Sequence, residues 1–178
     1  DVDFDEALAV LKSDIGAYDL VRALIEAAKT HKDEHPDIAM RCAKEALKIT
    51  PTLSIPNKQV LYSVLAAEAV QEIDPEFAWT IYDEQADAAM KLGGADYDAF
   101  VRGWMAEHIC DRDMDRAMEL IDGIIEPDEK ARHLGNVARH VAKTDPDRAL
   151  EMIQTIDSSG RNKALARLLP FFPEDRMD

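Results

Sequence analysis

The sequence predicts an all-α protein, an α-solenoid of about five helix–turn–helix repeats that together contain about ten helices. Three observations lead to this fold class. A short phrase recurs five times, an apolar face at helical period follows each copy, and turn-forming residues separate the helices. No segment shows the alternation of apolar and polar residues that indicates a half-buried β-strand. We therefore expect one helical-repeat domain that covers residues 1–178.

The recurring phrase is an acidic residue, one further residue, an alanine and a large apolar residue. Its alanines lie 32, 39, 39 and 32 residues apart, at Ala7, Ala39, Ala78, Ala117 and Ala149. Three and four residues after each alanine stand two more apolar residues, namely Val10/Leu11, Cys42/Ala43, Ile81/Tyr82, Leu120/Ile121 and Met152/Ile153. This spacing places them on one face of a helix, so we expect them, Cys42 included, to belong to the core.

Helix-start signals precede several copies of the phrase. Asp74-Pro75 and Asp145-Pro146 each place an N-cap aspartate before a proline at the first helical position, where its missing N–H costs nothing. His35-Pro36 places a proline at the same point of the second copy. These signals assign the phrase to the first helix of each repeat.

A second helical pattern lies between successive copies of the phrase. We expect these second helices at 17–31, 57–73, 95–112, 128–143 and 161–169. The apolar stripe of the fourth one consists of Ala131, Leu134, Ala138 and Val141. Breakers separate the two helices of each repeat, at Gly16, Pro51–Pro56, Gly93-Gly94, Glu126-Pro127 and Ser158–Gly160. The repeats therefore cover about 3–34, 35–73, 74–112, 113–144 and 145–172, and residues 173–178 begin a sixth repeat or form a cap.

This helix–turn–helix period resembles that of the tetratricopeptide and HEAT/armadillo class of helical repeats, whose units are roughly 34 or 40–47 residues long. The tetratricopeptide W-x2-L-G-x2-Y pattern is absent, because Thr80 to Asp83 follow Trp79 without the Leu-Gly pair. The resemblance is therefore to the class and not to one family. It implies a right-handed superhelix whose surface binds a partner.

The composition argues against several classes of function. The 36 Asp and Glu residues exceed the 21 Lys and Arg residues, so the formal net charge is −15 and no nucleic-acid partner is expected. No apolar run approaches the roughly 20 residues of a membrane-spanning helix, so no membrane partner is expected either. Cys42 and Cys110 form no C-x-x-C motif, so we expect no cysteine zinc site, no disulfide and a reducing, cytoplasmic location.

Two short motifs suit a metal ion, but a structural interpretation is favoured for both. His31 to His35 match the H-x-x-E-H string of inverted zinc peptidases, yet Pro36 follows and the string spans a break between two helices. Asp83 and Asp87 share a helix face that suits a hard cation, but a solvated helix face is the better explanation of them. We therefore expect no metal and no cofactor.

No catalytic constellation is recognisable either. His108 and Cys110 stand two apart on a helix, where their side chains point in different directions, so a Cys–His nucleophile pair is not expected. The sequence also lacks a G-x-S-x-G motif, a P-loop and a G-x-G-x-x-G motif. We therefore expect a protein that is not an enzyme, without catalytic or cofactor-binding residues.

Aromatic residues gather in the third repeat, which contains Phe77, Trp79, Tyr82, Tyr97, Phe100 and Trp104. Trp79 aligns with large apolar residues of the other copies, which favours a role in packing. An aromatic recognition platform is the alternative, since Trp and Tyr often anchor interfaces.

The most informative local feature is a basic strip in the fourth repeat, where no acidic residue occurs from Lys130 to Lys143. The candidate binding residues of this strip are Arg132, His133, Asn136, Arg139, His140 and Lys143. The last helix repeats the pattern with Arg161, Lys163 and Arg167. Such a strip suits an acidic peptide or a small anionic ligand. The alternative is a solvated face, or pairing with carboxylates of neighbouring helices.

A non-catalytic module that binds a protein or peptide partner is the function these observations favour. One alternative is an enzyme or a small anionic-ligand binder that uses the basic and histidine strip. Another is a structural end domain of a longer repeat array, with self-association through an end repeat.

Overall fold

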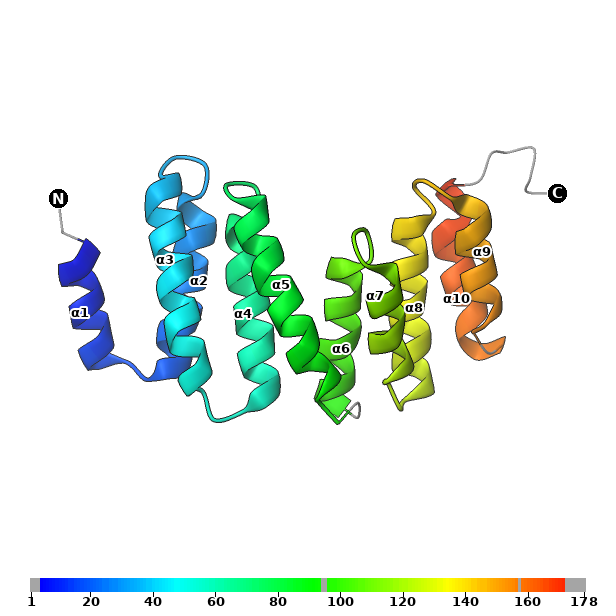
Figure 1. Cartoon of the computed structure of the whole chain (residues 1–178), viewed down its shortest axis with the longest axis horizontal. Helices are drawn as coiled ribbons and strands as arrows, with labels where there is room; N and C mark the ends of the chain where they lie inside the picture. The colour runs from blue at the N-terminus through cyan, green and yellow to red at the C-terminus, as the bar shows by residue number, and fades with distance from the viewer. Residues whose placement is uncertain (1–3, 94–95, 157, 172–178) are drawn as a thin grey trace. The chain divides into compact units, whose positions relative to one another are not determined.

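The structure, a computed structural model, describes residues 4–93, 96–156 and 158–171. In these ranges the chain forms ten α-helices and no β-strand, which confirms the all-α prediction (Figure 1). The helices are α1 (Phe4–Asp14), α2 (Ala17–His31), α3 (Pro36–Ile49), α4 (Pro56–Val70), α5 (Pro75–Met90), α6 (Asp96–Ile109), α7 (Met114–Asp122), α8 (Pro127–Val141), α9 (Pro146–Gln154) and α10 (Ser158–Leu168). Two short 3-10 helices, η1 (Thr50–Thr52) and η2 (Leu169–Phe171), follow α3 and α10. None of the helices described is long and apolar enough to span a bilayer.

The expected second helices correspond to α2, α4, α6, α8 and α10, and their ends agree with the prediction to within three residues. The largest difference at a helix start is in α10, which begins at Ser158, inside the stretch predicted as a breaker. A Cβ on Gly160 would lie 2.6 Å from the Cβ of Ala131 on α8. This glycine therefore permits close packing of two helices rather than ending one. Gly94 and residues 173–178, where a breaker and a sixth repeat were expected, lie outside the described residues.

Aspartate caps begin several of the first helices, as the sequence predicts. The side chain of Asp74 accepts a hydrogen bond from the backbone N–H of Phe77, and that of Asp145 accepts one from Arg148, both at 3.0 Å. Asp113 caps α7 in the same way. Each bond satisfies one of the N–H groups that a helix leaves unpaired in its first turn. The regular position of the recurring phrase at helix starts thus follows from these hydrogen bonds between aspartate side chains and the backbone.

The chain divides into two compact units, residues 1–85 and residues 86–178, and the boundary falls within α5. In the first unit α2 contacts α3 and α4, and α3 contacts α4. In the second unit α8 contacts the two helices that precede it, α6 and α7, and the two that follow it, α9 and α10. Each unit is thus built from helices that touch their next neighbour and their next-but-one neighbour. The single repeat domain over residues 1–178 stays a prediction.

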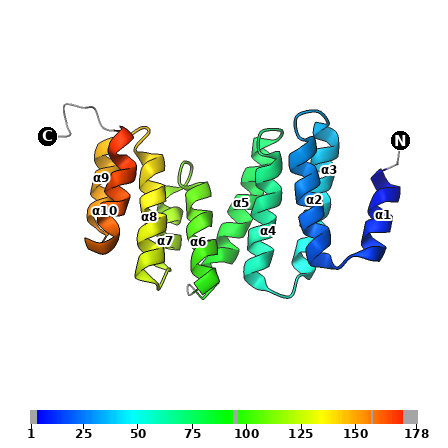
Figure 2. The ribbon, with the colours of Figure 1, turned by 180° about the vertical axis from the view of Figure 1, so that it is seen from behind.

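The core of the first unit lies between α2, α3 and α4, which run side by side in both views (Figures 1 and 2). Cys42 and Ala43 are buried there, as expected for the face that follows the recurring phrase. The same prediction is wrong for α1, since Val10 is 55% and Leu11 is 38% exposed. As the first helix described, α1 packs on α2 and forms the ion pairs Lys12–Glu45 and Asp5–Arg41 with α3, and these contacts leave part of its apolar face uncovered.

In the second unit the apolar stripe of α8 is buried as predicted, and so are Leu120, Ile121 and Ile153 of the neighbouring first helices. The buried face of α8 is wider than that stripe, because α8 is packed against four helices. His133, Gly135 and Val137 are buried as well. This extra burial decides how the predicted basic strip is arranged.

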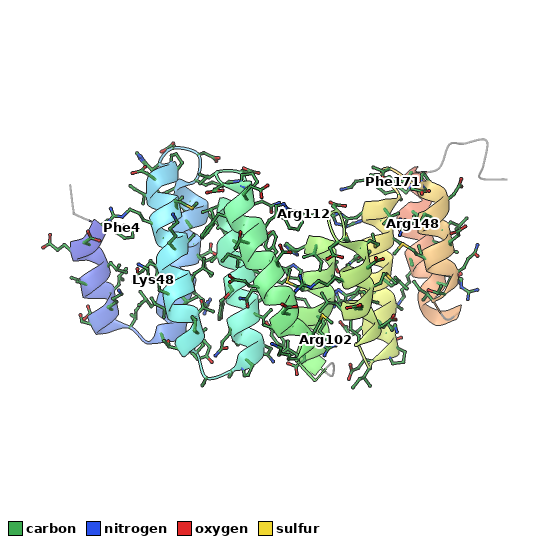
Figure 3. The ribbon with its side chains drawn as sticks, in the orientation of Figure 1. Phe4, Lys48, Arg102, Arg112, Arg148 and Phe171 are labelled. Atoms are coloured by element: carbon green, nitrogen blue, oxygen red, sulfur yellow. The ribbon has the colours of Figure 1, made fainter. Side chains whose placement is uncertain are left out.

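A buried arginine ties the end of α5 to α6 within the second unit. The side chain of Arg102, labelled in Figure 3, belongs to a residue that is only 9% exposed. Its Nη2 donates hydrogen bonds to the backbone carbonyls of Met90, at 2.6 Å, and Leu92. These carbonyls lie at the C-terminal end of α5, where helical carbonyls lack intrahelical partners. The guanidinium therefore fixes the connection that leads into α6.

Removing a cap tests the assignment of the helix starts. We expect Asp113→Ala to lower the free energy of unfolding by about 1 kcal/mol, because it leaves the N–H of Arg116 without its side-chain acceptor. Asp115→Ala removes the same charge from the same helical turn without touching the cap, so a clearly smaller loss is expected. Urea denaturation of both variants measures the difference. Equal losses would contradict the capping role.

Candidate functional site

The structure divides the predicted basic strip into an inner and an outer part. The inner part is Arg132, His133 and Asn136, which lie beside carboxylates of α6 and α8. The outer part is Arg139, His140 and Lys143, at and just beyond the end of α8. Arg139 and Lys143 are exposed, and His140 is half-buried. The six residues therefore form no single exposed surface.

His133, one of the candidate binding residues of the strip, is buried, because its side chain is 1% exposed. Its Nδ1 lies 2.6 Å from Oε1 of Glu107 on α6, and Nδ2 of Asn136 donates to the same oxygen at 2.8 Å. The Nη2 of Arg132 lies 2.6 Å from Nε2 of His133. Since a guanidinium only donates, Nε2 must accept, and the proton of a neutral ring stays on Nδ1 and is donated to Glu107.

The pKa of Glu107 reflects this arrangement. Burial raises the pKa of its carboxyl group, but the hydrogen bonds from His133 and Asn136 outweigh burial and hold the pKa below its ordinary value. Arg132 also pairs with Glu129, one turn away on its own helix. The inner part of the strip thus bonds to two carboxylates of the protein itself, which agrees with the intramolecular pairing named as an alternative.

A glycine makes room for this network. A Cβ on Gly103 of α6 would lie 2.0 Å from Cγ and 2.1 Å from Cδ2 of His133, far inside van der Waals contact. The imidazole would therefore have to leave its position beside Glu107, or α8 would have to shift. Gly103 is therefore required by the close approach of the two helices.

One face of α6 carries a row of rings next to the network. Tyr97 and Phe100 have centroids 5.5 Å apart, and Phe100 and Trp104 stack with an interplanar angle of 8° at 6.5 Å. The ring of His108 meets Trp104 edge-on at 4.5 Å. Tyr97 is 38% exposed, and the other three are half-buried. We call these four residues the α6 aromatic row.

A shallow cleft of about 530 Å³ opens beside this row, lined by Tyr97, Phe100, Glu126, Glu129 and Arg132. The guanidinium of Arg132 lies 5.8 Å from the centroid of the Phe100 ring, within the range of a cation–π contact. Phe100 also meets the buried His133 ring edge-on at 6.1 Å. Phe100 therefore packs against His133 on one side and faces the cleft on the other.

His140 and Lys143 of the outer part border a second cleft, of about 480 Å³. Cys110, Asp111 and His140 meet there, with one potential ligand atom of each residue within 4.8 Å of the others. Arg112, Lys143 and Arg148 also line this cleft, and Figure 3 labels the two arginines. The predicted binding of an anion stays a prediction for this outer part.

The chemistry of Cys110 and His140 is set by their burial. Burial, together with the nearby Asp111, raises the pKa of the Cys110 thiol to about 12, so the free thiol is no nucleophile at neutral pH. Burial and then Lys143 lower the pKa of His140. The Cys110 thiol donates to the backbone carbonyl of Glu107, and Nδ1 of His108 lies 2.9 Å from the backbone carbonyl of Trp104. The side chains of His108 and Cys110 thus contact different carbonyls.

The remaining candidates take structural positions. His31 ends α2 and Pro36 begins α3, so the H-x-x-E-H string spans a break between helices, as expected. Asp87 pairs with Arg116 of α7. Arg161 donates to the carbonyls of Gln154 and Ile156 at the end of α9. Lys163 lines a cleft between α8 and α10, and the side chain of Arg167 lies outside the described structure.

Sequence reasoning missed Glu107, Gly103 and the meeting of Cys110 with His140. One signal was present, because the ends of α6 and α8 occupy equivalent places in the predicted repeats, and these two helices are in contact. Comparison of the chain with protein-family models, with curated proteins and with solved structures finds no match.

The close approach of α6 and α8 leads to a test by substitution. We expect Gly103→Ala to destabilise the protein by about 3 kcal/mol, since the methyl group displaces His133 from Glu107. The cost should be smaller when Gly103→Ala is made in a His133→Ala background, because no ring is then displaced. Thermal and urea denaturation of the single and double variants measure both costs. Strictly additive costs would contradict the clash.

The pH dependence of stability tests the charge on Glu107. Because its pKa is lowered by folding, its contribution is complete above the ordinary value of 4.5 and is lost as the pH falls through the folded value. We expect Glu107→Gln to cost about 2 kcal/mol at pH 7, the typical value of a hydrogen bond to a charged group, and much less at pH 3. Glu119→Gln, on the exposed face of α7, is the matched control and should change stability little at either pH. A cost for Glu107→Gln that is independent of pH would contradict the assignment.

Proposed function

We propose that this chain is a non-catalytic interaction module, a small α-solenoid that binds a peptide segment of a protein partner on the α6 aromatic row of its second unit. The observation that supports this proposal above the others is the row itself. Four rings, at least partly accessible, stand in order along one helix, and the first two of them, Tyr97 and Phe100, line a cleft. Trp, Tyr and Arg are the residues that most often dominate binding energy at protein interfaces.

The dimensions of the row suit a short extended peptide. From Tyr97 to His108 the helix advances roughly 16 Å, at 1.5 Å per residue. About five residues of an extended strand cover that length. The rings are held by each other, by Arg132 and by His133, so little side-chain freedom is lost when a partner binds.

The charge of the surroundings favours a partner segment with apolar and basic side chains. Glu126 and Glu129 border the cleft with one arginine, Arg132, and that arginine is paired with Glu129. The formal net charge of −15 attracts basic segments over a longer range. The contacts of α2 with α4, of α6 with α8 and of α8 with α10 support the solenoid part of the proposal.

Peptide selection on the immobilised protein tests the function. Peptides selected from a random library should be rich in apolar and basic residues, and Tyr97→Ala and Phe100→Ala should each weaken their binding at least tenfold. Tyr18→Ala, which removes a half-buried tyrosine of the first unit, is the matched control and should leave affinity unchanged. Circular dichroism verifies that each variant is folded.

Two results would contradict the proposal. One is a selection that yields no peptide with measurable affinity for the folded chain. The other is a set of peptides that bind Tyr97→Ala and Phe100→Ala as tightly as the original protein, since the contact surface would then lie elsewhere.

A further inference from the structure

We propose that Cys110, Asp111 and His140 form a binding site for a transition-metal ion of the zinc type, with a coordination position that opens into the neighbouring cleft. This site lies apart from the α6 aromatic row and goes beyond the proposed peptide binding, so either proposal can fail without the other.

The spacing of the three donor atoms is the first argument. They all lie within 4.8 Å of one another, and Nδ1 of His140 is 3.8 Å from Oδ2 of Asp111. That separation exceeds a hydrogen bond. It is close to the roughly 3.3–3.7 Å that separates two ligands of one tetrahedral zinc ion with bonds of 2.0–2.3 Å. Small rotations of these side chains would complete the geometry.

The second argument is an unsatisfied atom. Nδ1 of His140 is shielded from solvent and has no hydrogen-bond partner in the described structure. A buried polar atom without a partner is costly, and most such atoms in proteins have one. A metal ion between Nδ1, the Asp111 carboxylate and the Cys110 sulfur would give this nitrogen its partner.

The supports of the site are rigid. Cys110 and Asp111 directly follow the last turn of α6, and His140 belongs to the last turn of α8, so two helices in contact hold the donors. The thiol now donates weakly, at 3.4 Å, to the Glu107 carbonyl. On binding, a sulfur–metal bond replaces the sulfur–hydrogen bond, and the proton is released to solvent.

The type of donor indicates the class of metal. A thiolate, an imidazole and a carboxylate suit Zn²⁺, Co²⁺ or Cu²⁺, whereas Mg²⁺ and Ca²⁺ prefer oxygen ligands alone. Three protein ligands leave one tetrahedral position, and the cleft of about 480 Å³ gives water or a small anion access to it. Arg112, Lys143 and Arg148 on the cleft wall favour an anion as that fourth ligand, while their charges oppose the cation itself.

Titration of the full chain with Co²⁺ tests the site by absorption. We expect one equivalent of Co²⁺ to produce the visible bands of a tetrahedral ion and a thiolate-to-cobalt charge-transfer band, and Zn²⁺ to abolish both by displacement. Cys110→Ser should remove the charge-transfer band, and His140→Gln should weaken Co²⁺ binding roughly 100-fold, with Asp111→Asn intermediate.

Cys42→Ser is the matched control, because Cys42 is the other buried cysteine and lies in the first unit. It should leave the spectrum and the affinity unchanged. His140→Gln keeps the test valid if Cys110→Ser proves unstable. The proposal is overturned if no thiolate band forms in the unaltered protein, or if Co²⁺ binds Cys110→Ser and His140→Gln with unchanged affinity.

Discussion

The contact between α6 and α8 is the constraint on which the second unit depends. His133 reaches the carboxylate of Glu107 only because Gly103 presents no side chain at the crossing. The buried imidazole and the half-buried carboxylate would each be destabilising without the other. Together with Asn136 and Arg132, these two side chains satisfy each other's hydrogen-bonding groups. An apolar pair could fill the same space, but its contact would not depend on direction. A polar network of this kind holds the two helices in one register, since a shift along either axis breaks several bonds at once.

Glu107 links the two ends of this helix pair. Its side chain holds His133, whose ring supports Phe100 in the α6 aromatic row. Its backbone carbonyl accepts a hydrogen bond from the thiol of Cys110, which lies beside Asp111 and His140. The proposed peptide surface and the proposed metal site are therefore separate in position but rest on the same two helices. A change that separates α6 from α8 would disturb both, whereas changes confined to Tyr97 or His140 act on one.

Much of the fold follows from the sequence because the signals that determine it are local. An aspartate before a helix accepts an N–H three residues later whatever the tertiary structure, and Asp74 and Asp145 do so. The burial of side chains depends instead on which helices come near. Val10 has the spacing of a core residue but is exposed, because α1 has a described neighbour on one side only. His133 has the spacing of a strip residue but is buried, because the glycine that admits it stands 30 positions earlier. No pattern within one helix contains that information.

The charged side chains show the same distinction between local signals and tertiary contacts. The formal net charge of −15 counts every carboxylate equally, yet the carboxylates have different tasks. Asp74, Asp113 and Asp145 bind backbone N–H groups at helix starts, and Glu107 and Glu129 bind side chains of α8. The hydrogen bonds that hold Glu107 ionised are interactions of the folded state, so part of the acidity stabilises helices and helix contacts. In the proposed function, a basic partner would be attracted by the whole field at long range, but at the α6 aromatic row it would meet Arg132 already paired with Glu129. Discrimination between partners at that proposed surface would therefore come chiefly from the shape and order of the rings, with the acidic surroundings setting the rate of encounter.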